Sequence, residues 1–259
     1  ETSRQIAAFP LGTQDTSDKF QIPQKLYGRG REVETLLTAF ERVAGRVGEW
    51  ESGRVGEWEN FTPSFPHPLA PSSSSQSKIE MMLIAGYSGI GKSALVQEIY
   101  KPITQKRGYF ISGKFDQLQR NIPYSAVISA FQELAQQLLS EPESQLQQWR
   151  DKLLAALGAN GQVIIDVIPE VELIIGKQPA VPEVGPTESQ NRFNRVFQSF
   201  IRVFCSKEHP LVIFLDDLQW VDSATLKLIE LMMTDSETQY LFLIGAYRDN
   251  EVESSHQLM

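Results

Sequence analysis

The sequence predicts an α/β fold in which a mostly parallel sheet is flanked by helices. Three apolar runs, at residues 81–85, 211–215 and 240–247, are typical of parallel strands, because such strands are covered on both faces. Stretches with helical spacing of apolar residues lie between these runs. With 259 residues, 41% of them hydrophobic, the chain can bury one good-sized core.

The start of the chain predicts a linker followed by the first helix of the domain. Residues 1–25 are polar and contain proline and glycine breakers, so we interpret them as a linker. We place the domain at residues 26–259. Its first helix is expected at residues 32–40, where four apolar residues form one face that would pack on the sheet, namely Val33, Leu36, Leu37 and Phe40.

An insertion is predicted at residues 45–77. The eight-residue unit at 45–52 recurs at 53–60, and Pro-rich and Ser-rich tracts follow it. Two copies are too few for a solenoid, and the Gly, Pro and Ser content is typical of a disordered low-complexity loop. The alternative is a partner-binding motif that uses Trp50 and Trp58.

The run at 81–85 leads into a phosphate-loop motif, G-x-x-x-x-G-K-[ST], and residues 94–100 then favour a helix. The glycines allow the backbone N–H groups to surround a β-phosphate, aided by the dipole of the helix. Lys92 would bridge the β- and γ-phosphates, and Ser93 would bind Mg²⁺. The alternative is a glycine-rich turn that binds no ligand. The expected nucleotide-binding residues are Gly86, Tyr87, Ser88, Gly89, Ile90, Gly91, Lys92 and Ser93.

Two carboxylates follow the run at 211–215. In phosphate-loop enzymes an acid at this position orders Mg²⁺, and a second acid beside it can polarise the attacking water. We therefore assign Asp216 to the metal and Asp217 to the water. The alternative is that the pair caps the turn before the next helix.

The remaining elements follow from periodicity. A short strand is expected at 109–112 and a helix at 124–139. Helical periodicity continues through 146–157 and, weakly, through 163–175.

Two capping signals define the later helices. Thr187 and Gln190 have the spacing of a capping box, which predicts a helix of about 20 residues. Asp222 is a good N-cap for a helix at 223–233.

The last strand, at 240–247, ends at Arg248. Ligands of open α/β sheets bind at the carboxyl ends of the strands. The phosphate loop, Asp216 and Arg248 are therefore expected to converge on one site.

Composition argues against several functions. A net charge of −8 and a pI near 5.1 argue against direct nucleic-acid binding, and no stretch is long and apolar enough to span a membrane. The single cysteine, Cys205, lies among apolar residues and is expected to be an inert thiol, and one cysteine allows no disulfide within the chain. Because the start also lacks a basic-then-apolar signal sequence, we expect a reducing, cytoplasmic setting. The chain opens on Glu1 without an initiator methionine, so we interpret it as a piece of a larger protein.

Four segments carry a family resemblance: Tyr27-Gly28-Arg29-x-x-Glu32, the phosphate loop, residues 215–222 and residues 246–248. The chain resembles the AAA-type ATPases of the STAND and origin-recognition-complex-like group. More narrowly, it is similar to the ATPase module of large bacterial proteins that combine a Ser/Thr kinase domain with sensor histidine kinase regions. The resemblance covers roughly residues 20–259, apart from the insertion.

The resemblance implies further site residues. Leu26, Tyr27, Gly28 and Arg29 would belong to the ATP site, with the backbone around Leu26 and Tyr27 contacting adenine. Without the resemblance, this segment is an ordinary helix start. Arg248 would be a sensor that reaches the γ-phosphate, and its alternative is a surface salt bridge.

One departure from motor ATPases bears on catalysis. The chain has Asp-Asp where those enzymes have Asp-Glu, so Asp217 lies farther from the water and hydrolysis is expected to be slow. Lys92, Asp217 and Arg248 are the expected catalytic residues. By the resemblance, a fifth strand and a helical lid should follow the last strand of this chain.

The expected function is an ATP-binding, Mg²⁺-dependent ATPase that acts as a slow nucleotide switch for attached kinase and sensor domains. The chain lacks the catalytic loop and the D-F-G segment of a protein kinase. Two alternatives remain. One is the ATPase of a DNA-binding regulator or replication initiator, which would bind DNA through a further C-terminal domain, and the other is a scaffold that holds ATP without hydrolysing it.

Overall fold

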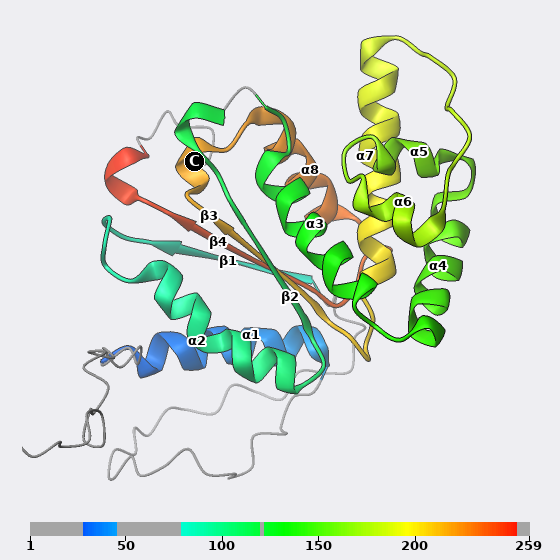
Figure 1. Ribbon diagram of the computed structural model, residues 1–259. Coiled ribbons are helices and arrows are strands. Elements are labelled where there is room, and N and C mark those ends of the chain that lie inside the picture. Colours follow the sequence, from blue (N-terminus) through cyan, green and yellow to red (C-terminus); the bar gives the residue numbers. More distant parts are fainter. Residues whose placement is uncertain (1–27, 46–78, 120–121, 253–259) are drawn as a thin grey trace, which may run out of the picture.

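The computed structural model describes residues 28–45, 79–119 and 122–252 (Figure 1). Leu26 and Tyr27, the predicted linker and, apart from Gly45, the predicted insertion lie outside the described residues.

The described residues contain one sheet of four parallel strands in the order β1-β4-β3-β2. The strands are β1 (Ile79–Ala85), β2 (Tyr109–Lys114), β3 (Leu211–Asp216) and β4 (Leu241–Tyr247). Leu211 is in register with Leu241 on one side and with Tyr109 on the other, so the strands start at one level. Because the strands are parallel and of similar length, their carboxyl ends form one edge, as the sequence predicts.

Helices cover both faces of this sheet (Figure 1). The helices that pack on it are α1 (Gly30–Ala44), α2 (Lys92–Gln105), α3 (Ser125–Leu139) and α8 (Ser223–Thr234). Strand β3 is buried between two cores. Val212 and Phe214 pack with α1 and α2, whereas Ile213 and Leu215 pack with α3 and α8. This alternation explains why the run at 211–215 is apolar throughout, and it confirms the predicted packing of the first helix.

The connection from β2 to β3 carries a further layer of helices, which lies beyond α3 in Figure 1. These helices are α4 (Glu143–Leu157), α5 (Gly161–Ile165), α6 (Glu170–Ile175) and α7 (Pro186–Phe204). Phe131 of α3 contacts Phe197, Phe200 and Phe204 of α7, with ring centroids 5.3 to 6.0 Å apart. Aromatic packing therefore joins this layer to the sheet.

Short 3-10 turns complete the described structure: η1 (Gln117–Gln119), η2 (Gly158–Asn160), η3 (Leu218–Trp220) and η4 (Asp249–Glu251).

The two predicted capping signals have opposite outcomes. Asp222 is the N-cap of α8, because its carboxylate accepts a hydrogen bond from the backbone N–H of Thr225 at 2.8 Å. The capping box at Thr187 and Gln190 is wrong. Helix α7 begins at Pro186, after an N-cap glycine that has no side chain with which to cap. The fixed φ of proline suits the first helical position, and Gln190 instead donates to the Tyr124 hydroxyl.

Candidate functional site

The phosphate-loop motif forms a tight connection between β1 and α2. Gly89 and Gly91 have φ angles of 77° and 89°, in the left-handed region that favours glycine. Gly91 is the residue that precedes α2, so the loop ends at a helix N-terminus. Backbone N–H groups at such a position attract phosphate. The strand, loop and helix predicted from the sequence are therefore all present.

Lys92 lies beneath this loop and is 8% exposed. Its ammonium donates to the carbonyl oxygens of Gly86, at 2.7 Å, and Tyr87, at 3.1 Å. In the part of the chain that the structure describes, no carboxylate pairs with this ammonium. The loop thus holds a positive charge against neutral acceptors, which suits an anion.

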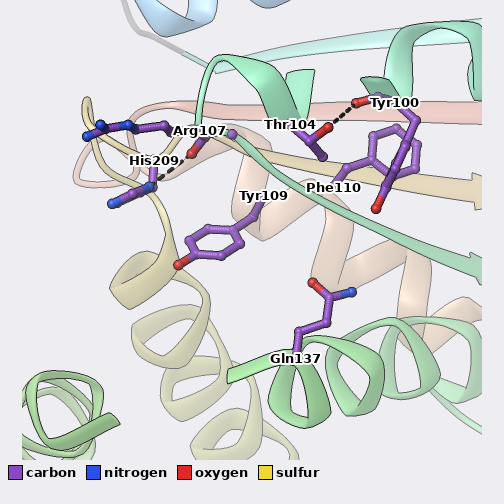
Figure 2. A pocket seen from close by; sticks show the side chains of 8 residues that line it. Tyr100, Thr104, Arg107, Tyr109, Phe110, Gln137 and His209 are labelled. Atoms are coloured by element: carbon purple, nitrogen blue, oxygen red, sulfur yellow. Dashed lines mark hydrogen bonds between the residues drawn. The ribbon is translucent and has the colours of Figure 1, made fainter. Parts of the chain in front are cut away.

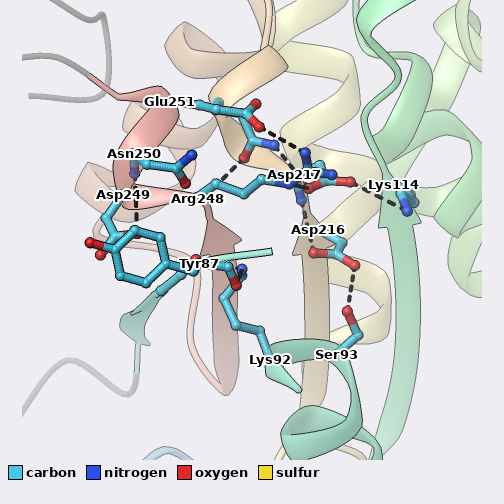
Figure 3. Close-up of polar contacts among 12 residues, drawn as sticks. Tyr87, Lys92, Ser93, Lys114, Asp216, Asp217, Arg248, Asp249, Asn250 and Glu251 are labelled. Atoms are coloured by element: carbon cyan, nitrogen blue, oxygen red, sulfur yellow. Dashed lines mark hydrogen bonds and ion pairs between the residues drawn. The ribbon is translucent and has the colours of Figure 1, made fainter. Parts of the chain in front are cut away.

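The two expected metal ligands meet at the carboxyl edge of the sheet (Figure 3). The Ser93 hydroxyl donates to the Asp216 carboxylate at 2.7 Å, although the residues are 123 positions apart in the sequence. Hydroxyl and carboxylate oxygens are the ligands that Mg²⁺ prefers, and Mg²⁺ is usually held by one or two protein groups together with phosphates and waters. Within the described ranges no cluster of three or more His, Cys, Asp or Glu residues could hold a metal, so a site here would have this sparse character.

Asp217 lies in a polar network. It adopts a left-handed conformation with φ of 55° and is 5% exposed. One carboxylate oxygen accepts from the Gln219 amide at 2.9 Å and lies 3.3 Å from Arg248 Nε. The other oxygen lies 3.3 Å from Lys114 Nζ. Asp216 and Asp217, although adjacent in sequence, therefore have different surroundings.

Arg248 follows β4 and completes this network (Figure 3). Its Nη1 donates to Glu251 at 2.7 Å, and this hydrogen bond raises the pKa of Arg248 above its ordinary value. The guanidinium lies over the Trp220 ring, 5.0 Å from the centroid. The backbone N–H of Arg248 donates to Gln219 at 3.1 Å. The structure therefore brings Arg248 beside the predicted carboxylates, in ion pairs with Asp217 and Glu251.

Arg29 connects the start of α1 to the phosphate loop. Its guanidinium donates to the carbonyl oxygen of Ile90 at 2.7 Å. Gly28, directly before it, has a φ of 85°. These are the two described residues of the segment that the resemblance assigns to the nucleotide, and Arg29 does lie against the loop.

Three residues of this site received no role from the sequence. Lys114 ends β2 in register with Asp216, whereas the strand predicted at 109–112 stops two residues earlier. Gln219 and Trp220 belong to the motif at 215–222, but the spacing of apolar residues does not predict that they contact Arg248. A polar residue at the carboxyl end of a strand is the one signal that indicates Lys114.

A separate cavity of about 290 Å³ lies at the opposite end of β2 (Figure 2). No expected site residue lines it. Burial, with the nearby Glu141 carboxylate, raises the pKa of Tyr109 in its wall to about 12. The lining residues are Tyr100, Thr104, Arg107, Gly108, Tyr109, Phe110, Gln137 and His209.

None of the helices in the described ranges combines the length and the apolar character that crossing a membrane requires.

Comparison with known proteins identifies relatives. A family model described as an AAA ATPase domain matches residues 67–244, more than half of the chain. The hybrid signal transduction histidine kinase G of Dictyostelium discoideum is 35% identical over 232 residues, which are 90% of this chain and 6% of that protein.

Two fungal proteins match more weakly. The peroxide stress-activated histidine kinase mak3 of Schizosaccharomyces pombe is 29% identical over 169 residues, and histidine protein kinase 1 of Candida albicans is 22% identical over 173 residues. These matches cover 60% and 61% of this chain, respectively, and 7% of each relative. The chain thus spans less than a tenth of the length of the curated relatives it matches.

The four-stranded parallel sheet, with a phosphate loop at a strand-to-helix connection, confirms the predicted fold. The family match agrees with the resemblance that the sequence motifs indicate. The chain belongs to the AAA ATPase domain family.

Proposed function

We propose that this chain binds ATP with Mg²⁺ and hydrolyses it slowly, and that its nucleotide state is a switch within a larger signal transduction kinase. One observation carries the proposal. The Ser93 hydroxyl and the Asp216 carboxylate lie 2.7 Å apart beside a phosphate loop whose lysine has no carboxylate partner among the described residues. This is the arrangement that a magnesium–triphosphate complex requires.

Each group has a role in this proposal. The loop backbone from Gly86 to Gly91 surrounds the β-phosphate, and Lys92 neutralises charge on the β- and γ-phosphates. Ser93 and Asp216 hold Mg²⁺, which neutralises charge that develops on the phosphates during transfer. The segment at residues 26–29 contacts adenine. The hydrogen bond from Arg29 to the Ile90 carbonyl favours a position of this segment beside the loop.

The surroundings of Asp217 favour slow turnover. We assign Asp217 to the attacking water and Arg248 to the γ-phosphate, yet the two side chains pair with each other at 3.3 Å. Asp217 also accepts from Gln219 and pairs with Lys114. Because both oxygens are already engaged, moving this carboxylate to an attacking water costs these contacts, which favours slow turnover.

The same observation favours a second candidate, a scaffold that holds ATP without hydrolysis. If the network around Asp217 persists when ATP is bound, the carboxylate stays with these partners instead of moving to the water. Measured turnover separates the two candidates.

The regulatory part of the proposal rests on the relatives. Their names describe histidine kinases, and this chain matches 6% to 7% of their lengths. We infer that the partners of this domain are other domains of the same polypeptide, such as kinase and sensor domains, and that ATP is its ligand.

The substitution Lys92→Ala tests the proposal. We expect ATP affinity to fall about 10- to 100-fold, because hydrogen bonds to charged groups contribute roughly 1.5–3 kcal/mol. Titration with a fluorescent ATP analogue measures the change. Lys101→Ala, on the exposed side of the same helix, is the matched control and keeps full affinity. Unchanged affinity in a Lys92→Ala protein that circular dichroism shows to be folded would remove the nucleotide assignment.

A further inference from the structure

The turn η3, directly after the Asp-Asp pair, packs on the end of β4. Gly245 of β4 makes this possible, because a Cβ at that position would lie 2.3 Å from the Leu218 side chain. Leu218 is 1% exposed and fills the space that the glycine leaves. The turn is thereby fixed against the strand that leads to Arg248.

Gln219 joins the ends of β3 and β4 through both halves of its amide. The amide nitrogen donates to Asp217 at 2.9 Å, and the amide oxygen accepts from the backbone N–H of Arg248 at 3.1 Å. The residue is 1% exposed. A buried amide with both ends engaged holds its partners in one geometry, because turning the amide would break both hydrogen bonds.

Trp220 fixes the side chain of Arg248. The guanidinium lies over the ring at 5.0 Å, which is a cation–π contact. Its nitrogens face Asp217 and Glu251 (Figure 3). Gln219 and Trp220 thus contact the backbone and the guanidinium of the same arginine from one turn.

We propose that Gln219 and Trp220 are positioning residues that hold Arg248 beside the two aspartates, so that Arg248 distinguishes a nucleoside triphosphate from a diphosphate. The inference rests on the proposed contact of Arg248 with the γ-phosphate. Neither residue belongs to the nucleotide-binding set that the sequence predicts, so both would act through the arginine. The function of Gln219 and Trp220, which follow the aspartates in the turn η3, would then be to position Arg248.

The proposal is tested by the ratio of two affinities, measured by calorimetry on the whole chain with Mg²⁺: that for the non-hydrolysable triphosphate AMP-PNP and that for ADP. A residue that only stabilises the fold lowers both affinities together. A residue that positions Arg248 lowers the affinity for the triphosphate and leaves that for ADP unchanged.

The first variant is Gln219→Met, which keeps the length of the side chain and removes both hydrogen bonds. We expect the preference for the triphosphate to fall about 3- to 10-fold, the range of a typical hydrogen bond. In an Arg248→Ala background the same substitution causes no further loss, because no guanidinium remains to be positioned. Gln198→Met removes a partly buried hydrogen bond from a side-chain amide of α7 to the Leu231 carbonyl of α8, and is the matched control with an unchanged ratio.

Trp220 gives an independent measurement should Gln219→Met fail to fold. Trp220→Leu removes the aromatic face and is expected to lower the preference about 2- to 5-fold, whereas Trp220→Phe retains a face and most of the preference. Equal ratios in wild type and Trp220→Leu would overturn the role of the ring.

Two results overturn the inference, and they are distinguishable. If Arg248→Ala lowers the preference but Gln219→Met and Trp220→Leu do not, the positioning role is wrong and the role of Arg248 stands. If Arg248→Ala itself leaves the preference unchanged, the assignment of Arg248 to the γ-phosphate is wrong, and the positioning role falls with it.

Discussion

The phosphate loop and the network around Asp217 lie at the same edge of the sheet and differ in how they are built. In the loop, Lys92 contacts carbonyls five and six residues earlier in the chain, and its charge faces neutral groups. In the network, Asp217 meets Lys114 of β2 and Arg248 after β4, so its charge is balanced within the protein. The loop is therefore ready for an anion, whereas Asp217 is held by partners within the protein.

Among the substitutions that test this comparison, Asp217→Asn is expected to have the largest effect. If Asp217 leaves the network to activate water, the substitution lowers turnover about 10²- to 10⁴-fold and keeps ATP binding. Single-turnover hydrolysis measures it. Asp235→Asn, which alters a carboxylate paired with Arg202 at 3.1 Å, is the control for the loss of an ion pair. Equal rates for wild type and Asp217→Asn would favour the scaffold that does not hydrolyse ATP.

Asp216→Asn tests the aspartate that contacts the phosphate-loop motif through Ser93. We expect ATP affinity in Mg²⁺ to fall about 10- to 100-fold, because in the proposed function this carboxylate holds the metal. Affinity in the presence of EDTA should not change. An equal loss with and without metal would instead mean that Asp216 acts only through its hydrogen bond to Ser93.

The same contrast explains what the sequence predicts. The glycine, lysine and serine of the loop act within eight residues, so their pattern indicates both the structure and the chemistry. The meeting of Ser93 with Asp216 is also predictable, because parallel strands align their carboxyl ends. The fold class follows from the apolar runs, because successive side chains of a buried strand pack alternately into two cores.

The network could not be predicted, because it depends on register and on one backbone angle. Lys114 reaches Asp217 only because β2 pairs with β3 so that Lys114 lies opposite Asp216. Asp217 turns toward Gln219 and Arg248 because its φ is positive, which no local motif specifies. The wrong capping box has a related cause, since Gln190 bonds to Tyr124, which lies 66 residues earlier.

Lys114→Ala is expected to have a smaller effect, in the opposite direction from Asp217→Asn. Removing one cation frees an oxygen of Asp217, so turnover should rise up to about 5-fold. Stability should change little, because the Lys114 side chain is 67% exposed and such pairs contribute roughly 0–1 kcal/mol. Lys227→Ala, which breaks the exposed pair with Glu230, is the control. An unchanged rate would mean that Lys114 does not restrain the carboxylate.

The smallest expected effect concerns the other end of β2, where Tyr109 is desolvated rather than paired with a cation. Burial raises its pKa from 10.0 to about 12, so the folded protein binds the phenolic proton more tightly than the unfolded chain does. This contribution to stability is complete below pH 10 and is lost as the pH rises toward 12. Thermal melting between these values should therefore show a steeper loss for wild type than for Tyr109→Phe, which has no proton to release. Parallel curves for the two proteins would mean that the hydroxyl is solvated, and the ends of β2 would then not differ in the way described.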